Sequence, residues 1–275
     1  MSFDQAVIFW CVLVPASIAA GASWLASTRA GWVAAVGSVI GWWLAVAIAL
    51  AGCQGLQWWP EESWQRIIWP ALGWVLFLST TARFQGREWR WVLAGILAAW
   101  TAMVSMPQGE AWSDLFDLYR DWIPLLVVSC LANGFAIESM AKTGAGRWCL
   151  LVTVGALLGP LVLAATTYGS LAQWALALVV ATFSQAVVGL FRSKLPVWIA
   201  AFPAWAAAVG VVASARFYTY EEHPVWLYGL ILFSPTLIAS IDLAIHRRSE
   251  RGRVIVSATA SLLIIGAVTW TLLSS

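Results

Sequence analysis

Three charged residues in one short stretch have the types and spacing of a catalytic group. Glu61, Glu62 and Arg66 lie in the segment WWPEESWQRIIWP, between two long apolar runs. Carboxylates can activate a water molecule for hydrolysis when other groups converge on the same point. The alternative is a membrane edge, because proline followed by two glutamates is typical of a helix start, and tryptophan and arginine suit the lipid headgroup region.

The spacing Glu-Glu-x-x-x-Arg resembles the first motif of the membrane protease family that processes prenylated CAAX proteins and bacteriocins. That resemblance implies two further motifs, Phe-x-x-x-His and His-x-x-x-Asn/Asp, and neither is present. The residues four positions before and after the two histidines are Thr219 and Leu227 around His223, and Asp242 and Glu250 around His246. A CAAX-type intramembrane protease is therefore the weakest hypothesis. Because zinc and phosphate-loop motifs are also missing, the sequence predicts no enzyme activity, no cofactor and no metal site.

The composition indicates which solvent surrounds the chain. Of its 275 residues, 61% are hydrophobic and 10% are charged, whereas an average soluble domain carries roughly 25% charged residues. The excess apolar surface must meet lipid, which predicts an all-α, polytopic transmembrane helix bundle in one integral membrane domain, residues 1–275. A net charge of +2 is too small to indicate a nucleic-acid partner.

The apolar runs predict about ten transmembrane helices, since one crossing takes roughly 20 residues. The predicted spans are 5–26, 31–52, 64–82, 89–106, 122–141, 148–167, 170–190, 195–215, 224–244 and 254–273. With the N-terminus outside, 12 of the 15 Lys and Arg residues fall on the cytoplasmic side. The sequence therefore predicts a cytoplasmic (inner) membrane protein with both termini on the non-cytoplasmic side. Its preference for arginine over lysine suggests a bacterial source.

Polar groups and a proline within the predicted spans are the candidate substrate-binding residues. They are Asn133 and Gly134 in the fifth span, Gln185 in the seventh and Pro235 in the ninth. A buried amide must find a partner on another helix or on a ligand, and a proline in mid-span leaves a carbonyl free, as in the discontinuous helices of transporters. For each of these residues, plain bonding between helices is the alternative.

Two carboxylates near the cytoplasmic surface are candidates for a gating or proton-linked role. Glu138 and Asp242 lie in the last turns of their spans, four residues before Lys142 and His246. The alternative is that each forms an ordinary ion pair with that neighbour on the same helix.

Trp42 and Trp100 lie deep in predicted spans and are candidates to line an aromatic cavity, with plain packing as the alternative. The four cysteines are scattered without a C-x-x-C pair, so we expect buried, unpaired side chains. A bridge between Cys11 and Cys53 near the outer face is the alternative.

Two segments suggest an internal repeat, because WPALGWVLFLSTTARF (69–84) and FPAWAAAVGVVASARF (202–217) align without gaps. The halves 1–141 and 142–275 would then hold five helices each, in opposite orientations, as in many secondary transporters.

Three functions remain as hypotheses. The first is a small-solute transporter or permease using alternating access, in which the scarcity of buried charge favours a neutral or lipophilic solute. The second is a non-catalytic assembly, scaffold or sensor subunit, and the protease is the third. A cavity reaching Asn133 favours transport, and a solid bundle favours the second hypothesis.

Overall fold

The computed structural model describes residues 3–29, 31–54, 62–81, 89–107, 116–140, 146–192, 197–218, 223–245 and 249–274. Within these ranges all regular secondary structure is helical, which confirms the predicted class. In chain order the helices are α1 (Phe3–Val7), the π-helix η1 (Ile8–Leu13), α2 (Val14–Ala26), α3 (Trp32–Gln54), α4 (Ser63–Arg66), α5 (Ile68–Thr81), α6 (Trp89–Ser105), α7 (Phe116–Met140), α8 (Gly146–Thr167), α9 (Gly169–Phe191), the 3-10 helix η4 (Val197–Ala200), α10 (Ala201–Tyr218), α11 (Val225–Leu232), α12 (Ser234–Ala244) and α13 (Glu250–Ser274).

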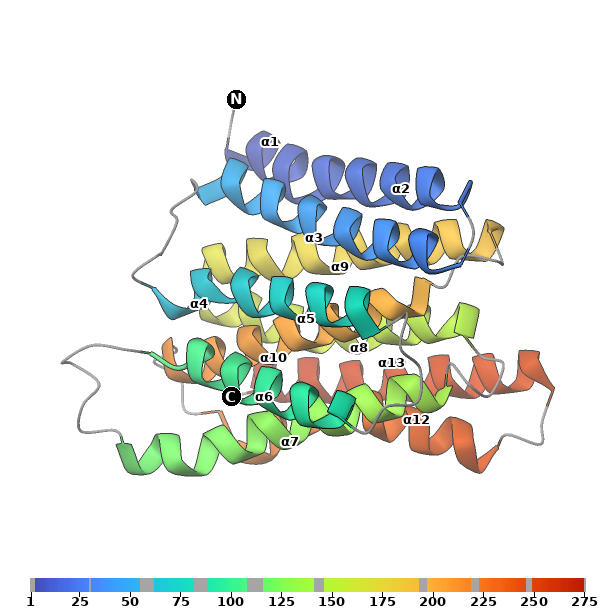
Figure 1. Ribbon diagram of the computed structural model, residues 1–275. Coiled ribbons are helices and arrows are strands. Elements are labelled where there is room, and N and C mark those ends of the chain that lie inside the picture. Colours follow the sequence, from blue (N-terminus) through green and yellow to red (C-terminus); the bar gives the residue numbers. More distant parts are fainter. Residues whose placement is uncertain are drawn as a thin grey trace.

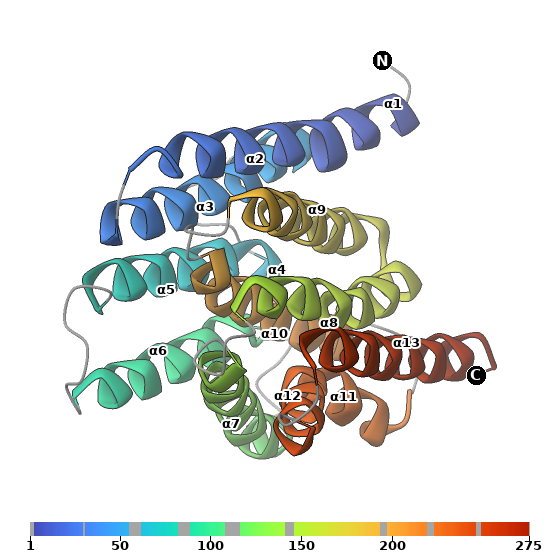
Figure 2. The ribbon, with the colours of Figure 1, turned by 90° about the vertical axis from the view of Figure 1, so that its right-hand side faces the viewer.

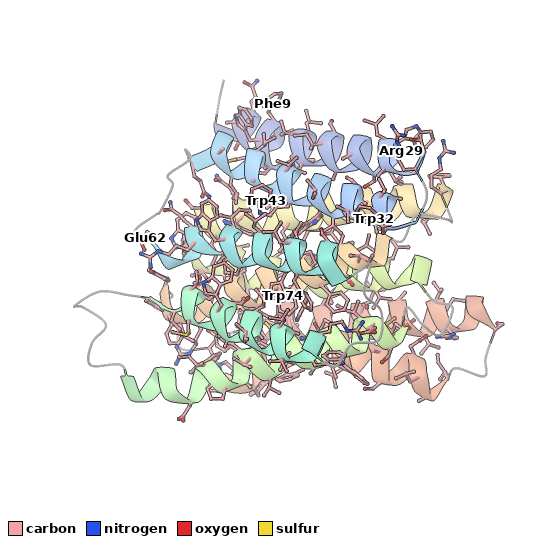
Figure 3. The ribbon with its side chains drawn as sticks, viewed as in Figure 1. Phe9, Arg29, Trp32, Trp43, Glu62 and Trp74 are labelled. Carbon is pink, nitrogen blue, oxygen red and sulfur yellow. The ribbon has the colours of Figure 1, made fainter. Side chains whose placement is uncertain are left out.

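These helices lie alongside one another in a single bundle, and successive long helices run in opposite directions (Figure 1). The described chain begins and ends at the same end of the bundle, where α1 starts and α13 finishes (Figures 1 and 2). The labelled side chains show which residues lie at each end of the bundle. Phe9 and Glu62 lie at that shared end, whereas Arg29 and Trp32 lie at the opposite one (Figure 3).

Helix α10 is the centre of the bundle. It packs against α5, α6, α7, α8 and α9, and nearly all of its 18 residues are buried. A helix that is apolar on every side must be buried on every side, and its many alanines let the neighbouring backbones come close. Gly210 shows how close, because a Cβ there would lie 2.7 Å from Cγ1 of Ile67, at the junction of α4 and α5.

The outer helices have the opposite character. In the most apolar 18-residue stretch of the α1–α2 segment, only 22% of the residues are buried. In the corresponding stretch of α13, only 17% are buried. Leu262, Leu263 and Trp270 on α13 point outward and are mostly exposed. A continuous apolar surface of this kind is stable against hydrocarbon and not against water, so these faces contact the lipid bilayer.

By length and composition, the protein crosses a membrane several times. Six described helical segments are long and apolar enough to span it: Asp4–Ala26, Trp32–Gln54, Asp121–Met140, Leu150–Thr167, Gly169–Phe191 and Gly252–Ser274. The bent pair α11–α12, with a 54° angle between its parts, would be a seventh. Each of the ten predicted spans coincides with a helix or a helix pair. By helix length and composition, however, six or seven of them qualify as membrane crossings.

The structure does not show the predicted internal repeat. The segments compared in the sequence do have similar local forms, since the short turns α4 and η4 each precede a helix that begins with an aromatic-Pro-Ala segment. The packing of the two halves differs, however. In the second half α8 packs against α13, whereas their counterparts α2 and α7 lie on opposite sides of the bundle (Figure 2).

Candidate functional site

The pair α11–α12 is broken at Phe233 because Pro235 has no backbone N–H. In a continuous helix that N–H would donate to the carbonyl oxygen of Ile231. The Ser234 hydroxyl takes its place and donates to the Ile231 oxygen at 2.9 Å. The chain bends by 54° at this point, and both Ser234 and Pro235 are buried.

Asn133 on α7 satisfies the remaining backbone groups at the break. Its Nδ2 donates to the Leu232 carbonyl oxygen at 2.7 Å, and its Oδ1 accepts from the Thr236 N–H at 3.1 Å and the Thr236 hydroxyl at 2.7 Å. In a continuous helix, Leu232 and Thr236 would bond to each other directly. Ser129, one turn away on α7, also donates to the Leu232 oxygen at 2.9 Å. We call Ser129, Asn133, Ser234 and Thr236 the brace.

Asn133 joins α7 to the broken pair α11–α12. Its Nδ2 also lies 3.2 Å from the Ser129 hydroxyl, so the protein itself uses both ends of the Asn133 amide. The neighbouring Gly134 packs tightly, because a Cβ there would lie 3.2 Å from Cε1 of Phe202 on α10. The cavity that Gly134 lines has a volume of about 10 Å³, enough for roughly one water molecule.

Gln185 belongs to a separate polar cluster between α2, α3 and α9. Its Nε2 donates to the Ser38 carbonyl oxygen at 2.6 Å and to the Ser23 hydroxyl at 2.9 Å. One turn along the same interface, Trp42 Nε1 donates to the Thr182 hydroxyl at 3.0 Å. The Gln185 Oε1 is buried and has no hydrogen-bond partner among the described residues. This cluster joins three helices at the edge of the bundle, away from the brace.

Trp100 is not brought together with Trp42. It lies on α6, is 37% exposed, and covers Gly73 of α5, where a Cβ would lie 2.6 Å from Cζ3 of the Trp100 ring. Trp42 is fully buried between α3 and α9. The two rings therefore take part in different helix contacts, and a shared aromatic cavity remains a prediction.

Glu138 and Asp242 each pair with an arginine from another helix. Glu138 Oε1 accepts from Arg90 Nη2 at 2.9 Å. The pairing of Asp242 is bidentate, since its Oδ1 accepts from Arg253 Nε at 2.9 Å and its Oδ2 accepts from Arg253 Nη2. Two parallel bonds of this kind fix the orientation of both groups as well as their distance. The predicted partners, Lys142 and His246, lie outside the described residues.

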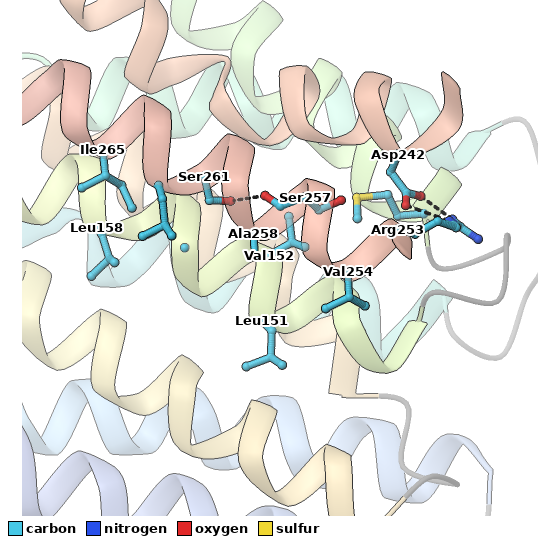
Figure 4. Close-up of a pocket in the computed structure, with 13 residues that line it drawn as sticks. Leu151, Val152, Leu158, Asp242, Arg253, Val254, Ser257, Ala258, Ser261 and Ile265 are labelled. Atoms are coloured by element: carbon cyan, nitrogen blue, oxygen red, sulfur yellow. Dashed lines mark hydrogen bonds and ion pairs between the residues drawn. The ribbon is translucent and has the colours of Figure 1, made fainter. Parts of the chain in front are cut away.

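A groove of about 300 Å³ lies between α8 and α13, beside the Asp242–Arg253 pair (Figure 4). Its walls are mainly apolar, with the ion pair at one end and two serines along one side. It is lined by Met140, Leu151, Val152, Gly155, Leu158, Asp242, Arg253, Val254, Ser257, Ala258, Ser261, Leu262 and Ile265. We call this set the groove. Its volume is at the lower end of the range for small-molecule sites in proteins.

Ser257 is the polar group within the groove that lacks a partner. The neighbouring Ser261 hydroxyl donates to the Ser257 carbonyl oxygen at 2.9 Å, as serines within helices often do. The Ser257 hydroxyl itself is buried, and no described residue bonds to it. The Ser257 oxygen has almost no exposed surface, so a molecule in the groove would bond with it only after the Ser257 side chain rotates.

Small residues shape the groove, and the sequence reasoning missed them. On α8, Gly155 approaches α13 so closely that a Cβ there would lie 3.2 Å from the Ser261 side chain. The signals were Gly155-x-x-x-Gly159 and Ser257-x-x-x-Ser261, a spacing typical of close helix contacts in membranes. These contacts bring α8 and α13 together and leave the groove where larger side chains are absent.

The segment that resembles a protease motif is described only in part. Glu62 is exposed at the start of α4, Arg66 is buried at the end of that turn, and Glu61 lies outside the described residues. The described ranges also contain no cluster of three or more metal-ligating side chains.

Comparison of the chain with protein-family models, with curated proteins and with solved structures finds no match. The function therefore has to be argued from the groove and the helices that form it.

Proposed function

We propose that this multi-pass membrane protein is a transporter for a lipophilic or amphiphilic small solute, which it takes from the bilayer into the groove. The observation that carries the proposal is the groove itself: about 300 Å³ of apolar space in helices that contact lipid, with an unpartnered hydroxyl inside. The proposal is for a carrier and not an enzyme.

The lining of the groove defines the solute. Apolar walls favour an apolar body, because a solute from the bilayer exchanges contacts with lipid for close van der Waals contacts with the groove and no polar group has to be desolvated. The Ser257 hydroxyl can make one hydrogen bond, and such a bond is stronger away from water. The charges of Asp242 and Arg253 offset each other, so the groove has no net charge to attract an ion. A neutral molecule with one hydrogen-bonding group fits best.

The break at Phe233 provides a means of movement. Asp242 lies on α12, beyond the break, and bonds to Arg253 on α13. A change in the angle at Phe233 would move Asp242 relative to the rest of the groove and so open or close that end. Hinges of this kind occur in the discontinuous helices of secondary transporters.

The proposed carrier crosses the cytoplasmic membrane ten times, with both termini on the non-cytoplasmic side. Support for the threading comes from the alternating helix directions and from the separation of Arg29 from Glu62 at opposite ends (Figure 3). Shorter helices such as α6 would cross where the bilayer is locally thinner or the surrounding protein shields them.

A ligand screen with two matched variants tests the proposal. Both Ala258 and Thr259 are exposed, but only Ala258 is among the residues that line the groove. Purified protein is screened for thermal stabilisation by neutral metabolites and lipids. We expect hits whose affinity falls at least tenfold, by an order-of-magnitude estimate, in Ala258→Phe and not in Thr259→Phe, because only the first fills the groove. Hits that bind both variants alike would contradict the site.

The solidity of the brace favours the second function, a scaffold or sensor subunit. The cavity lined by Gly134, the neighbour of Asn133, has a volume of about 10 Å³, enough for roughly one water molecule. Uptake of a hit into proteoliposomes separates the two functions. Accumulation that Ala258→Phe abolishes supports the carrier, whereas binding without uptake supports a sensor.

A further inference from the structure

Two cysteines that are far apart in the sequence meet at the end of the bundle where the chain begins. The Sγ atoms of Cys11 in η1 and Cys53 in the last turn of α3 are 2.9 Å apart. Non-bonded heavy atoms rest at roughly 3.5–4.0 Å, and a thiol is only a weak hydrogen-bond donor. Both cysteines are free thiols in the structure, and two reduced thiols gain little from such an approach, whereas an S–S bond of about 2.05 Å needs only a small further movement.

The surrounding residues hold these two sulfurs together. Helix η1 is a six-residue π-helix, and this wider turn carries Cys11 as its one buried residue. Such π-helical turns are rare and occur often at functional sites. Beside it, Gly52 of α3 lies so close to Trp10 that a Cβ there would be 2.1 Å from the indole ring. The absence of a side chain at Gly52 thus lets the end of α3 approach η1.

We propose that Cys11 and Cys53 form a disulfide in the native protein, which fastens the first transmembrane segment to the end of α3. Phe9, two residues before Cys11, lies at the same end of the bundle as Glu62 (Figure 3). Disulfides persist on the oxidising side of a membrane, so this cross-link requires that end to face outward. It is independent of the groove, and neither proposal depends on the other.

The oxidant is an oxidised dithiol protein or small-molecule disulfide, and Cys53 reacts first because it is the less buried thiol. Its thiolate attacks one sulfur of the oxidant and displaces the other as a thiolate, which gives a mixed disulfide. Cys11 then loses its proton and attacks the Cys53 sulfur, releasing as a thiolate the oxidant sulfur that was bound to Cys53 in the mixed disulfide. The net reaction joins two thiols in a disulfide and reduces the disulfide of the oxidant to two thiols.

Thiol counting tests the cross-link. Membranes are isolated with a thiol-blocking reagent and no reductant, and the denatured protein is analysed by intact mass. The chain has four cysteines, so we expect two labels before reduction and four after it. Without reduction, Cys11→Ser should carry three labels because it frees Cys53, while the control Cys130→Ser should carry one.

Peptide mapping then has to recover the linked segments that contain Cys11 and Cys53. Reduction should lower the melting temperature of the wild type by several degrees, as an order of magnitude, and leave that of Cys11→Ser unchanged. Four labels on the unreduced wild type, or a link that involves Cys130 or Cys149, would overturn the proposal. Neither result affects the binding test of the groove.

Discussion

The brace and the groove lie on two sides of α12 and differ in whether their buried polar groups have hydrogen-bond partners. At the brace, Asn133 bonds with both ends of its amide, and the cavity next to Gly134 holds about 10 Å³. In the groove, about 300 Å³ is open and the Ser257 hydroxyl has no described partner. Burial of a polar group without a partner costs stability, and the structure avoids this cost at Asn133 but not at Ser257. Polarity at membrane depth is therefore not a sufficient sign of a binding site.

The charged end of the groove gives the largest expected effect. Asp242→Leu leaves the guanidinium of Arg253 without its buried carboxylate, which costs about 3–5 kcal/mol of stability when a buried pair is broken. Thermal unfolding in detergent measures it. Glu138→Leu is the matched control, because Arg90 is 25% exposed and Arg253 only 11%, so water can replace more of the lost pairing. Equal losses in the two variants would contradict the difference in burial.

Asn133→Leu should have the next largest effect. It leaves the Thr236 N–H without a partner and removes one of two donors to the Leu232 oxygen, which costs about 2–3 kcal/mol. The control is Ser240→Ala on α12, whose exposed hydroxyl donates only to the Thr236 carbonyl oxygen. If Asn133→Leu unfolds at the wild-type temperature and loses binding of a solute instead, Asn133 is a ligand contact and not part of a brace.

The smallest changes in stability are expected for alanine substitutions of two buried serines. Ser129→Ala removes a donor to the Leu232 oxygen and should cost about 1 kcal/mol. Ser257→Ala removes a hydroxyl without a described partner, so stability should change by less than about 0.5 kcal/mol. The same two variants, titrated with a solute, should show weaker binding only for Ser257→Ala. The opposite pattern would exchange the roles of the brace and the groove.

The helices were predictable because long apolar runs leave few alternatives to membrane helices, and Pro235 marked the position of the break. The partners of the buried charged groups could not be predicted from the sequence. Arg253 looked like one more loop charge, yet it folds back onto Asp242, and Glu138 bonds to Arg90 of another helix. Such pairings depend on how helices are placed beside one another, which the helix pattern along the sequence does not specify.

The groove was harder still to predict, because it is defined by side chains that are missing. Gly155 and Ser261 have the spacing of a close helix contact, and the sequence shows that much. Whether such a contact is filled or leaves a space depends on the neighbours of both helices in three dimensions. Asn133 attracted attention because a polar residue in an apolar run is conspicuous, while Ser257 blends into a run of small residues.

Photolabelling of the membrane-embedded protein most directly tests whether the groove holds a solute. The probe is a single-chain amphiphile that carries a diazirine, and labelled peptides are mapped by mass spectrometry. The account predicts saturable labelling of residues 151–158 and 254–265, lost in Ala258→Phe and kept in Thr259→Phe. Labelling that never saturates, or that is as strong on the outer face of α2 as on α13, would contradict it.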